Sequence, residues 1–592
     1  MSLMIAGDIE TSDGLKGQKF ALGGLYTGKK FYQTNNLEDY LNTLLTFSGK
    51  KHNVYFHNLN FDGRFILQFC EDNDIPYNLI FRDSTLLCIR ILKGKRALKI
   101  LNSFAIIPKP LADFTKMFNL KYEKPGLDDL KLRNKLDCIM LYEGLQRFFA
   151  ATTKGMTVSQ ISLKLYAKHS NRKGIFQAGE LEDIGRLGYY GGRVEVFNFN
   201  PQKVKVYDIN SLYPTVMRNN LYPINMRVEK PNLDILDKEL FYVKAVIDIE
   251  EQFIPPLPIK FNNKLIFPTG RIEGWFYSPE LNLVKNNVIE IKEAYSFECD
   301  YLFKSFVDHY WRLRKELKEQ GNGLESVYKL ILNSLYGKFA QKREKETLIR
   351  QEEPEPGCVE LFEGIYFKTA MVKSKSQWIN PFISGFITSY ARAYLYKFLA
   401  QDVAYCDTDS VFITSNRSLP VGNELGEFKL EAEGMFYPLA PKVYYLDNDK
   451  KPIAKAKGLS RLLLKNVKSY QEFFDLIRNN EIEIYMQPKE AIRRTGNYLS
   501  VKTIKKEFTL TYDKRVKLKD LTTRPWDITE LMEIEYNKNM AKYRREEEKY
   551  LMQQYKEWKK SDYFDEQLID NTLTSNENYE LYRLRRFGDF YY

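Results

Sequence analysis

The sequence predicts a multidomain protein of the α/β and α+β classes. Its 592 residues are enough for about four domain-sized units. Strand-like and helical runs alternate through the first ~130 residues, which is the pattern of an α/β domain. The glycine-rich stretch Gly188–Gly192 marks a junction, and the composition changes to a long charged helix after Pro525. These three observations together predict several separately packed units.

The first unit, residues 1–187, is assigned to the α/β class from its local patterns. Its strand-like runs are MIAGDIE, KFALGGLY, NVYFHN and ALKILNSF, and its helical runs are FDGRFILQFC and PLADFTKMFNL. Lys131–Ala150 follows as one longer predicted helix. Alternation of the two kinds of run predicts strands and helices that share one domain.

A second mixed α/β region runs from the junction to about Lys457 and is interrupted by Lys342–Lys373. The interruption is rich in Glu, Pro and Gly, and β-like segments flank Pro354–Gly357 inside it. A structureless loop of roughly 30 residues is uncommon in a compact domain. We therefore expect a β-hairpin that projects from this region.

The rest of the chain divides into two parts. Leu459–Val516 is expected to form a smaller α+β unit. Beyond Arg524, a charged helix is predicted over Ile528–Lys560, and a polar, aromatic end follows it.

Composition limits the possible function classes. The net charge of +12 favours a polyanionic partner, and abundant Tyr and Phe side chains suit stacking on bases. No apolar run approaches 18 residues, so we expect no membrane contact. The six cysteines are scattered singly, which argues against a zinc site or a disulfide framework and favours a cytoplasmic location. With only four dispersed histidines, a metal ion would have to be held by carboxylates.

The first set of carboxylates lies in the N-terminal unit. GDIET places Asp8 and Glu10 on the same face of a strand, because strand side chains alternate. HNLNFDG supplies Asn58 and Asp62, and NKLDC supplies Asp137 on a helix. Four carboxylates without cysteine or histidine suit Mg²⁺ or Mn²⁺. Two such ions can stabilise the attacking water and the leaving oxygen of a phosphodiester.

The second set begins with VYDINSLYP. Asp208 ends a strand that alternates buried positions, and Ser211 is expected to cap the following helix. The free N–H groups of that helix would face a triphosphate. The flat ring of Tyr213 could press on the sugar and exclude a 2′-hydroxyl.

A helix and a hairpin complete the second set. In YKLILNSLYGKF, Lys329, Asn333 and Tyr336 are spaced to share one helix face, where the cation would meet phosphate and the ring the nascent base pair. YCDTDSVF reads as a hairpin tip, and its Asp409 could hold two Mg²⁺ ions together with Asp208.

These motifs resemble those of a known family. DINSLYP, KLILNSLYGKF and YCDTDS are similar to the three polymerase motifs of family B DNA polymerases, and GDIET, NLNFD and Asp137 resemble their 3′–5′ exonuclease. GYYGG, PKVYY and KAKG resemble, more narrowly, motifs of the protein-primed phi29-type phage branch. The resemblance covers about residues 4–520. It implies a ribonuclease-H-like exonuclease domain joined to a right-hand polymerase of palm, fingers and thumb.

The resemblance also implies roles for individual residues. The implied catalytic residues are Asp208, Asp409, Asp407 (accessory), Asp8, Glu10, Asp62, Asp137 and Lys124. The implied metal ligands are Asp208, Ile209, Asp409, Asp8, Glu10, Asp62 and Asp137, for two Mg²⁺ or Mn²⁺ ions per site. The implied nucleotide-binding residues are Ile209, Leu212, Tyr213, Lys315, Lys329, Asn333 and Tyr336. The implied DNA-binding residues are Asn58, Phe61, Tyr189, Gly191, Gly192, Gly337, Lys442, Tyr444 and Lys455.

The resemblance divides the chain and suggests partners. The expected parts are the exonuclease (1–187), linker and first palm segment (188–225), palm insertion that contacts a terminal protein (226–300), fingers (301–341), β-hairpin insertion for strand displacement (342–373), second palm segment (374–457), thumb (458–521) and C-terminal extension (522–592). DNA template and primer, dNTPs, a terminal protein primer and a single-stranded-DNA-binding protein are the implied partners.

One position departs from the family pattern, and three rival functions stay open. The family has a water-orienting tyrosine four residues before its last exonuclease aspartate, whereas this chain has Arg133. The rivals are a DNA-primed family B polymerase of a mobile element or plasmid, a nuclease with an inactive polymerase module, and a non-enzymatic nucleic-acid-binding scaffold. A reverse transcriptase would have adjacent acids in the hairpin, but Thr408 separates them here.

Overall fold

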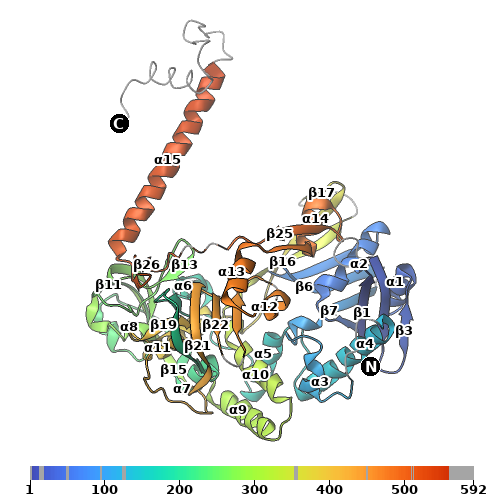
Figure 1. Cartoon of the computed structure of the whole chain (residues 1–592), viewed down its shortest axis with the longest axis horizontal. Coiled ribbons are helices and arrows are strands. Elements are labelled where there is room, and N and C mark those ends of the chain that lie inside the picture. The colour runs from blue at the N-terminus through green and yellow to red at the C-terminus, as the bar shows by residue number, and fades with distance from the viewer. Residues whose placement is uncertain are drawn as a thin grey trace.

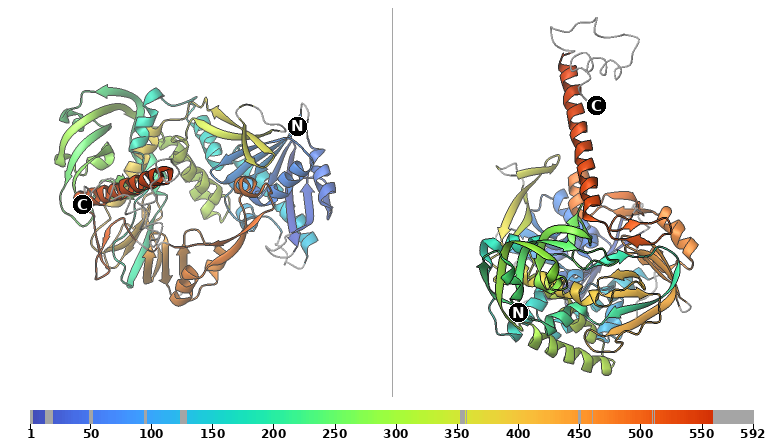
Figure 2. Two further views of the ribbon diagram at one scale, coloured as in Figure 1. Left: turned by 90° about the horizontal axis from the view of Figure 1, so that it is seen from above. Right: turned by 90° about the vertical axis from the view of Figure 1, so that its left-hand side faces the viewer.

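The computed structural model describes residues 3–12, 19–48, 52–93, 96–122, 129–351, 356, 358–448, 451–459, 461–508, 510 and 512–558. An N-terminal body and a larger central body lie side by side, and one long helix projects from the central body (Figures 1 and 2). In the part of the chain so described, no helix is both long and apolar enough to cross a membrane.

The N-terminal body is built on a mixed sheet. β3, β2 and β1 are antiparallel, and β1, β4 and β7 are parallel, which agrees with the predicted ribonuclease-H-like fold. β5 and β6 extend the sheet as an antiparallel pair. The strands are β1 (Met4–Ser12), β2 (Lys19–Tyr26), β3 (Phe31–Thr34), β4 (Asn53–Phe56), β5 (Tyr77–Arg82), β6 (Thr85–Lys93) and β7 (Arg96–Asn102).

Helices cover this sheet and lead to the central body. They are α1 (Leu37–Leu45), α2 (Leu59–Asp72), α3 (Asp113–Phe118), α4 (Leu130–Ala151), α5 (Val158–His169) and α6 (Glu182–Leu187). One hydrophobic core contains Met140 of α4, Ile161 of α5 and Ile331 of the fingers. The two bodies therefore share one hydrophobic core.

The insertion at 342–373 differs from the predicted hairpin. It has three strands, β16 (Glu344–Gln351), β17 (Cys358–Phe362) and β18 (Ile365–Lys373), and β18 pairs with both of the others. β16 also pairs with β5, so the insertion does not project freely and instead extends the N-terminal sheet to ten strands. An exposed edge strand carries unpaired N–H and C=O groups, and β16 satisfies those of β5.

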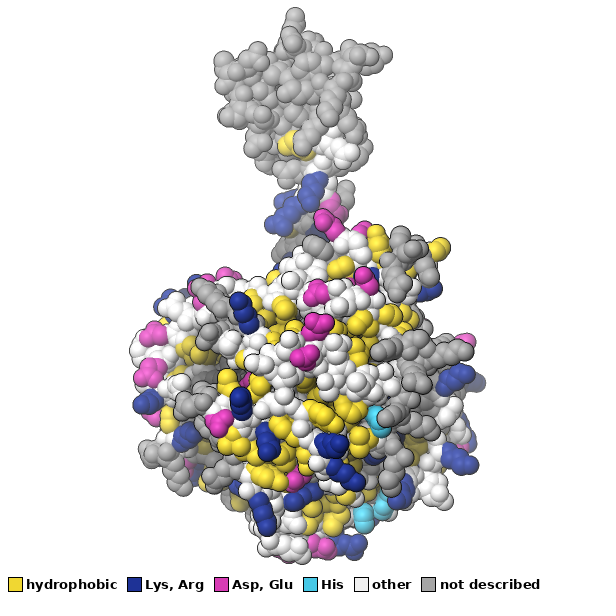
Figure 3. All heavy atoms as spheres, turned by 90° about the vertical axis from the view of Figure 1, so that its right-hand side faces the viewer, with side chains coloured by type: hydrophobic (Ala, Val, Ile, Leu, Met, Phe, Trp, Pro, Cys, Tyr) yellow, Lys and Arg dark blue, Asp and Glu magenta, His cyan; other side chains and the backbone are white. Residues whose placement is uncertain are grey.

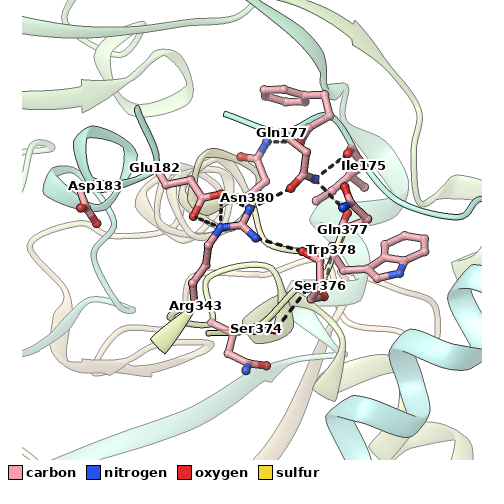
Figure 4. A network of polar contacts seen from close by, with 12 residues as sticks. Ile175, Gln177, Glu182, Asp183, Arg343, Ser374, Ser376, Gln377, Trp378 and Asn380 are labelled. Carbon is pink, nitrogen blue, oxygen red and sulfur yellow. Dashed lines mark hydrogen bonds and ion pairs between the residues drawn. The ribbon is translucent and has the colours of Figure 1, made fainter. Parts of the chain in front are cut away.

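Arg343 anchors the base of this insertion (Figure 4). Its Nε donates to both carboxylate oxygens of Glu182 at 3.1 and 3.0 Å, and one terminal nitrogen donates to Gln177 at 2.8 Å. The other terminal nitrogen donates to the carbonyl of Ser376 at 3.3 Å. The point where the chain leaves the central body is therefore tied to the segment that joins the two bodies.

The central body contains a seven-stranded antiparallel sheet, which is the predicted palm. Its order is β23-β22-β21-β9-β20-β19-β8. The strands are β8 (Val194–Val196), β9 (Gln202–Ile209), β19 (Val403–Asp407), β20 (Ser410–Ile413), β21 (Phe428–Ala440), β22 (Val443–Asp447) and β23 (Ile453–Ala456). The palm helices are α7 (Leu212–Asn219), α8 (Ser278–Leu281) and α11 (Pro381–Tyr396).

A second sheet, two fingers helices and the thumb surround the palm. The second sheet has the order β10-β15-β11-β14. Its strands and the adjacent hairpin are β10 (Tyr222–Glu229), β11 (Phe241–Ile249), β14 (Gly270–Tyr277), β15 (Val288–Asp300), β12 (Ile259–Phe261) and β13 (Lys264–Ile266). The predicted fingers contain α9 (Lys304–Glu319) and α10 (Glu325–Ser334). The predicted thumb contains α12 (Arg461–Lys465), α13 (Tyr470–Arg478), β24 (Glu481–Tyr485), α14 (Pro488–Thr495) and β25 (Val501–Lys505).

The C-terminal segment returns to the palm before it leaves the body. β26 (Val516–Lys517) pairs with β27 (Thr523–Arg524), and α15 extends over Ile528–Trp558. Leu531 near the start of α15 is 2% exposed, whereas Met532 and Tyr536 are 63% and 65% exposed. The helix is therefore anchored by its first turn and then projects away (Figure 1).

Candidate active sites

The palm brings two predicted acids together. Asp208 lies near the end of β9 and pairs across the ladder with Ser410 of β20. Asp409 lies in the turn before β20, and its carbonyl accepts a 2.7 Å bond from the N–H of Ile209. Thr408 makes the turn possible with a left-handed φ of 63°. Both acids therefore lie at the same end of two adjacent strands.

No basic side chain is in direct contact with either of these two carboxylates among the described residues. Among the described residues, neither forms an ion pair or a side-chain hydrogen bond. Burial, followed by repulsion from Asp409, raises the pKa of Asp208 to about 7. Burial, followed by repulsion from Asp407, raises the pKa of Asp409 to about 6. Ionising two neighbouring, partly buried carboxylates costs free energy, and a bound divalent cation would offset that cost. Carboxylate oxygens are the ligands that Mg²⁺ prefers, so the two residues fit the expected Mg²⁺ site.

Asp407 has different partners. Lys442 Nζ donates to its carboxylate at 2.7 Å, and Lys455 Nζ lies 3.7 Å from the other oxygen. The hydroxyl of Tyr405 also donates to Asp407 at 3.3 Å. Asp407 thus gathers both lysines predicted to hold the primer strand. Lys455 also lies 5.6 Å from the ring centroid of Tyr444, the third residue of that prediction.

Aromatic and basic side chains lie near the palm acids. The Tyr213 and Tyr336 rings stack with centroids 4.1 Å apart and planes 16° apart. Burial raises the pKa of Tyr213 and of Tyr336, so both phenols stay neutral. Lys329 of α10 is exposed, and its charge acts to lower the pKa of Asp208. Asn333, one turn further along α10, is half-buried.

Two local expectations for this region are wrong, and one is displaced. Ser211 has a left-handed φ of 54° and makes no side-chain cap bond. Tyr336 does not continue α10, because α10 ends at Ser334 and Tyr336 begins a 3₁₀ turn. Lys315 pairs with Glu424 of a palm loop in this structure, so it does not lie against the palm acids.

One of the two linker glycines, Gly192, packs against the acid-bearing turn. A Cβ on Gly192 would lie 2.6 Å from the Thr408 methyl group, so only glycine fits there. A Cβ on Gly191 or on Gly337 would meet nothing within 4 Å, which leaves open space at both positions. The Tyr189 side chain is half-buried, and burial raises its pKa to about 12.

Sequence reasoning missed the residues that hold the linker. Arg392 of α11 donates to the carbonyls of Tyr190 and Gly191 at 2.7 and 2.8 Å. Glu280 accepts from its Nε at 2.7 Å, and both side chains are 3% exposed. The available signal was a single arginine in an otherwise uncharged helix, since a buried charge must be paired.

The N-terminal body brings three other predicted acids together. Oxygens of Asp8 and Glu10 on β1 and of Asp137 on α4 lie within 4.8 Å of one another. Burial and then repulsion from the neighbouring carboxylates raise the pKa of Asp8 well above its ordinary value. Asn134 Nδ2 donates to Asp8 Oδ2 at 2.9 Å, a contact that sequence reasoning missed. The three carboxylates fit a hard cation.

Asp62 lies beside this group and is held by the sheet. Its Oδ1 accepts the N–H of Ile9 at 3.0 Å, and burial raises its pKa to about 8. Asn58 precedes α2 with a left-handed φ of 70°. The Phe61 ring lies 6.1 Å from that of Tyr485 in the predicted thumb, so the thumb segment contacts the N-terminal body here. Lys124, a predicted catalytic residue, is outside the described residues.

Arg133 makes an unexpected contact with this group. Its Nε lies 3.1 Å from Glu10 Oε1.

The surface on the N-terminal side carries scattered Lys and Arg side chains among exposed hydrophobic ones, most densely in the lower half of Figure 3. Such a surface suits an anionic polymer.

Comparison with known proteins gives consistent matches. The model of a family described as DNA polymerase type B, organellar and viral, matches residues 44–143 and 128–419. The DNA-directed DNA polymerase of Enterobacteria phage PRD1 is 28% identical over 461 residues, which cover 71% of this chain and 78% of that protein. A probable DNA polymerase of Podospora anserina is 26% identical over 414 residues, which cover 60% of this chain and 34% of that protein. A structure of phi29 DNA polymerase with primer-template DNA and incoming nucleotide is similar in fold, with a TM-score of 0.66 and 22% identity over 80% of this chain and 95% of that one.

Proposed function

The chain belongs to the organellar and viral type B DNA polymerases, and on this premise we propose a protein-primed replicative polymerase with a 3′–5′ proofreading exonuclease. A protein of this family synthesises DNA on a DNA template. The observation that carries the proposal for the palm is the pair of acids with raised pKa values, Asp208 and Asp409, near stacked aromatic rings. A deoxynucleoside triphosphate bound there would bring the metal charge that these acids lack.

The palm residues have distinct parts in polymerisation. Mg²⁺ ions held by the carboxylates of Asp208 and Asp409, with the Ile209 carbonyl as an implied ligand, would stabilise the charge of the transferring phosphoryl group. Lys329 would bind triphosphate oxygens, and Leu212 would present the first free N–H groups of α7. The Tyr213 ring would lie under the sugar and exclude a 2′-hydroxyl. Lys442 and Lys455 would hold primer phosphates next to Asp407.

The proofreading activity is proposed from the second acid group. Asp8, Glu10 and Asp137 fit a hard divalent cation, and Asp62 lies beside them. Asn58 and Phe61, at the start of α2, would bind the unpaired 3′ end. Hydrolysis would release one nucleotide at a time from that end.

Strand displacement is proposed from the insertion at 342–373. Because β16 pairs with β5, and Leu348 and Phe367 are buried among exonuclease residues, the insertion bridges from the palm to the N-terminal body. Arg350 Nε also donates to the Glu71 carboxylate at 3.2 and 3.0 Å. A template strand that passes this bridge would be separated from its complement.

Primer extension with labelled dNTP tests polymerisation. Asp409→Ala should reduce synthesis by about a thousandfold or more while DNA binding survives. Retention of a tenth of the parent rate would contradict the assignment. Incubation of the chain with template and the product of a neighbouring gene tests priming, because a covalent protein–nucleotide adduct is expected.

Absence of that adduct, together with efficient extension of a DNA primer, would favour the DNA-primed alternative. Extension by the parent chain would exclude both a nuclease with an inactive polymerase module and a non-enzymatic scaffold. We also propose that a single-stranded-DNA-binding protein assists the enzyme and that it works in the host-cell cytoplasm.

A further inference from the structure

We propose that Arg133 is a resident counter-cation of the exonuclease site that competes with divalent ions for Glu10. The proposal rests on the proposed exonuclease function and adds a determinant of its metal affinity. Arg133 Nε lies 3.1 Å from Glu10 Oε1, and the two side chains are 22% and 14% exposed. Because water screens this pair only partly, its charges interact more strongly than those of a surface pair.

Glu10 is also one of the three clustered acids. Its carboxylate lies within 4.8 Å of ligand oxygens on Asp8 and Asp137. A divalent ion bound by all three acids would use an oxygen that lies next to the guanidinium. Arg133 therefore occupies part of the charge environment that such an ion requires.

The first turn of α4 fixes the position of Arg133. The Asp129 side chain caps the helix by accepting from the N–H of Leu132 at 2.9 Å, and the N–H of Arg133 donates to the Asp129 carbonyl at 3.0 Å. Asn134 Nδ2 bonds to the Asp8 carboxylate and to its carbonyl, at 2.9 and 3.1 Å. The helix turn is thus tied to β1 at the residue next to Arg133.

A further contact secures the same turn. Gln33 Nε2 donates to Asn134 Oδ1 at 3.0 Å and to the Lys131 carbonyl at 2.9 Å. With the backbone held at these points, the direction from which the guanidinium approaches Glu10 is set. The Arg133–Glu10 contact is therefore supported by the tertiary structure around α4 and β1.

The Nε atom of Arg133 is held near Glu10 by charge and not by an aligned hydrogen bond. Among the described residues its Nε has no hydrogen-bond partner despite the short distance to Glu10. A divalent ion can therefore displace it without breaking a well-formed hydrogen bond, but must overcome the charge pair. The ion and the guanidinium compete for the same carboxylate. The free energy of the Arg133–Glu10 pair is therefore subtracted from the binding free energy of the ion.

Titration calorimetry with Mn²⁺ tests the competition directly. The full-length chain with Asp208→Asn and Asp409→Asn serves as the background, so that binding at the palm acids is suppressed. In this background Arg133→Gln should raise Mn²⁺ affinity about 5- to 150-fold, the usual range of coupling between neighbouring sites. Arg133→Lys keeps the positive charge, so its Mn²⁺ affinity should stay close to that of the background chain.

Lys135→Gln is the matched control. It removes the same charge from the same helix, but its nitrogen lies 6.0 Å from the centroid of the Phe31 ring and makes no ion pair with Glu10. Its Mn²⁺ affinity should equal that of the background chain. If Arg133→Gln fails to fold, as judged by its melting curve, Arg133→Met is titrated in its place.

The outcomes separate this inference from the proposed function. Equal or weaker Mn²⁺ binding by the neutral Arg133 variants, with degradation of single-stranded DNA intact in the parent, overturns the competition and leaves the exonuclease standing. Tighter binding without any degradation at saturating Mn²⁺ supports the competition and overturns the exonuclease.

Discussion

Asp208→Asn should make the metal-free protein more stable at pH 8, although we expect it to remove polymerase activity. The Asp208 carboxyl has a pKa of about 7, against an ordinary value of 3.8, first because of burial and then because Asp409 lies nearby. A group whose pKa is raised on folding is stabilising only when it is protonated. The free energy of unfolding therefore falls as the pH rises from about 4 to 7. The Asp208→Asn variant has a side-chain amide that does not titrate, so it does not undergo this loss.

The magnitude follows from the size of the pKa change. A rise from 3.8 to about 7 corresponds to at most about 4 kcal/mol at pH 8. Asp208 is only half-buried, so solvent screening reduces this, and we expect about 1 to 2 kcal/mol. For a domain of palm size that gain corresponds to a rise in Tm of roughly 2–8 °C.

Thermal unfolding in EDTA at pH 5 and pH 8 measures the effect. At pH 5 the folded carboxyl is still protonated and only the first part of the loss has occurred, so the two melting temperatures should differ less at pH 5 than at pH 8. Glu433→Gln is the control, because Glu433 is an exposed palm acid paired with Lys203 at 3.2 Å. A variant that melts below the parent at pH 8, or that differs equally at both pH values, would refute the reasoning.

Four further changes test other parts of the structure. Tyr213→Val should raise ribonucleotide incorporation relative to deoxynucleotides, and an unchanged ratio in primer extension would place the ring elsewhere. Replacing residues 352–364 with a short Gly-Ser link keeps the pairing of β16 with β5 and β18; it should preserve gap filling but reduce strand displacement, and equal displacement would make the tip dispensable. Truncation after Tyr536 keeps the buried Leu531 and should leave extension on short templates unchanged, whereas truncation at Arg524 should lower the yield of soluble protein. Half-maximal extension should need more Mg²⁺ at pH 6 than at pH 8, because protons on Asp208 and Asp409 must leave first; a constant Mg²⁺ requirement would contradict the raised pKa values.

Local patterns in the sequence were sufficient to predict several parts of the two sites. Asp8 and Glu10 share a strand face because side chains alternate along a strand. YCDTDSVF forms a tight turn between two strands, as its flanking β-formers indicated. Asp137 lies on the predicted helix. Each of these features depends on residues only a few positions apart.

Some local conformations were not readable from the same patterns. Ser211 was expected to cap α7 but adopts a left-handed conformation instead. Tyr336 has helical spacing from Lys329, yet the helix ends before it. Local spacing did not predict these conformations, because tertiary context overrides intrinsic preference.

Only the tertiary structure decided which distant segments meet. β16 adds to the edge of the N-terminal sheet beside β5, although more than 250 residues of chain separate them. Arg392 reaches the linker carbonyls, and Arg133 reaches Glu10 across the first turn of α4. General principles require a partner for a buried charge or an open strand edge, but the sequence alone does not identify that partner. That choice depends on how the whole chain closes, because any of several sequence-distant groups could satisfy the same charge or edge and only the packed core selects among them.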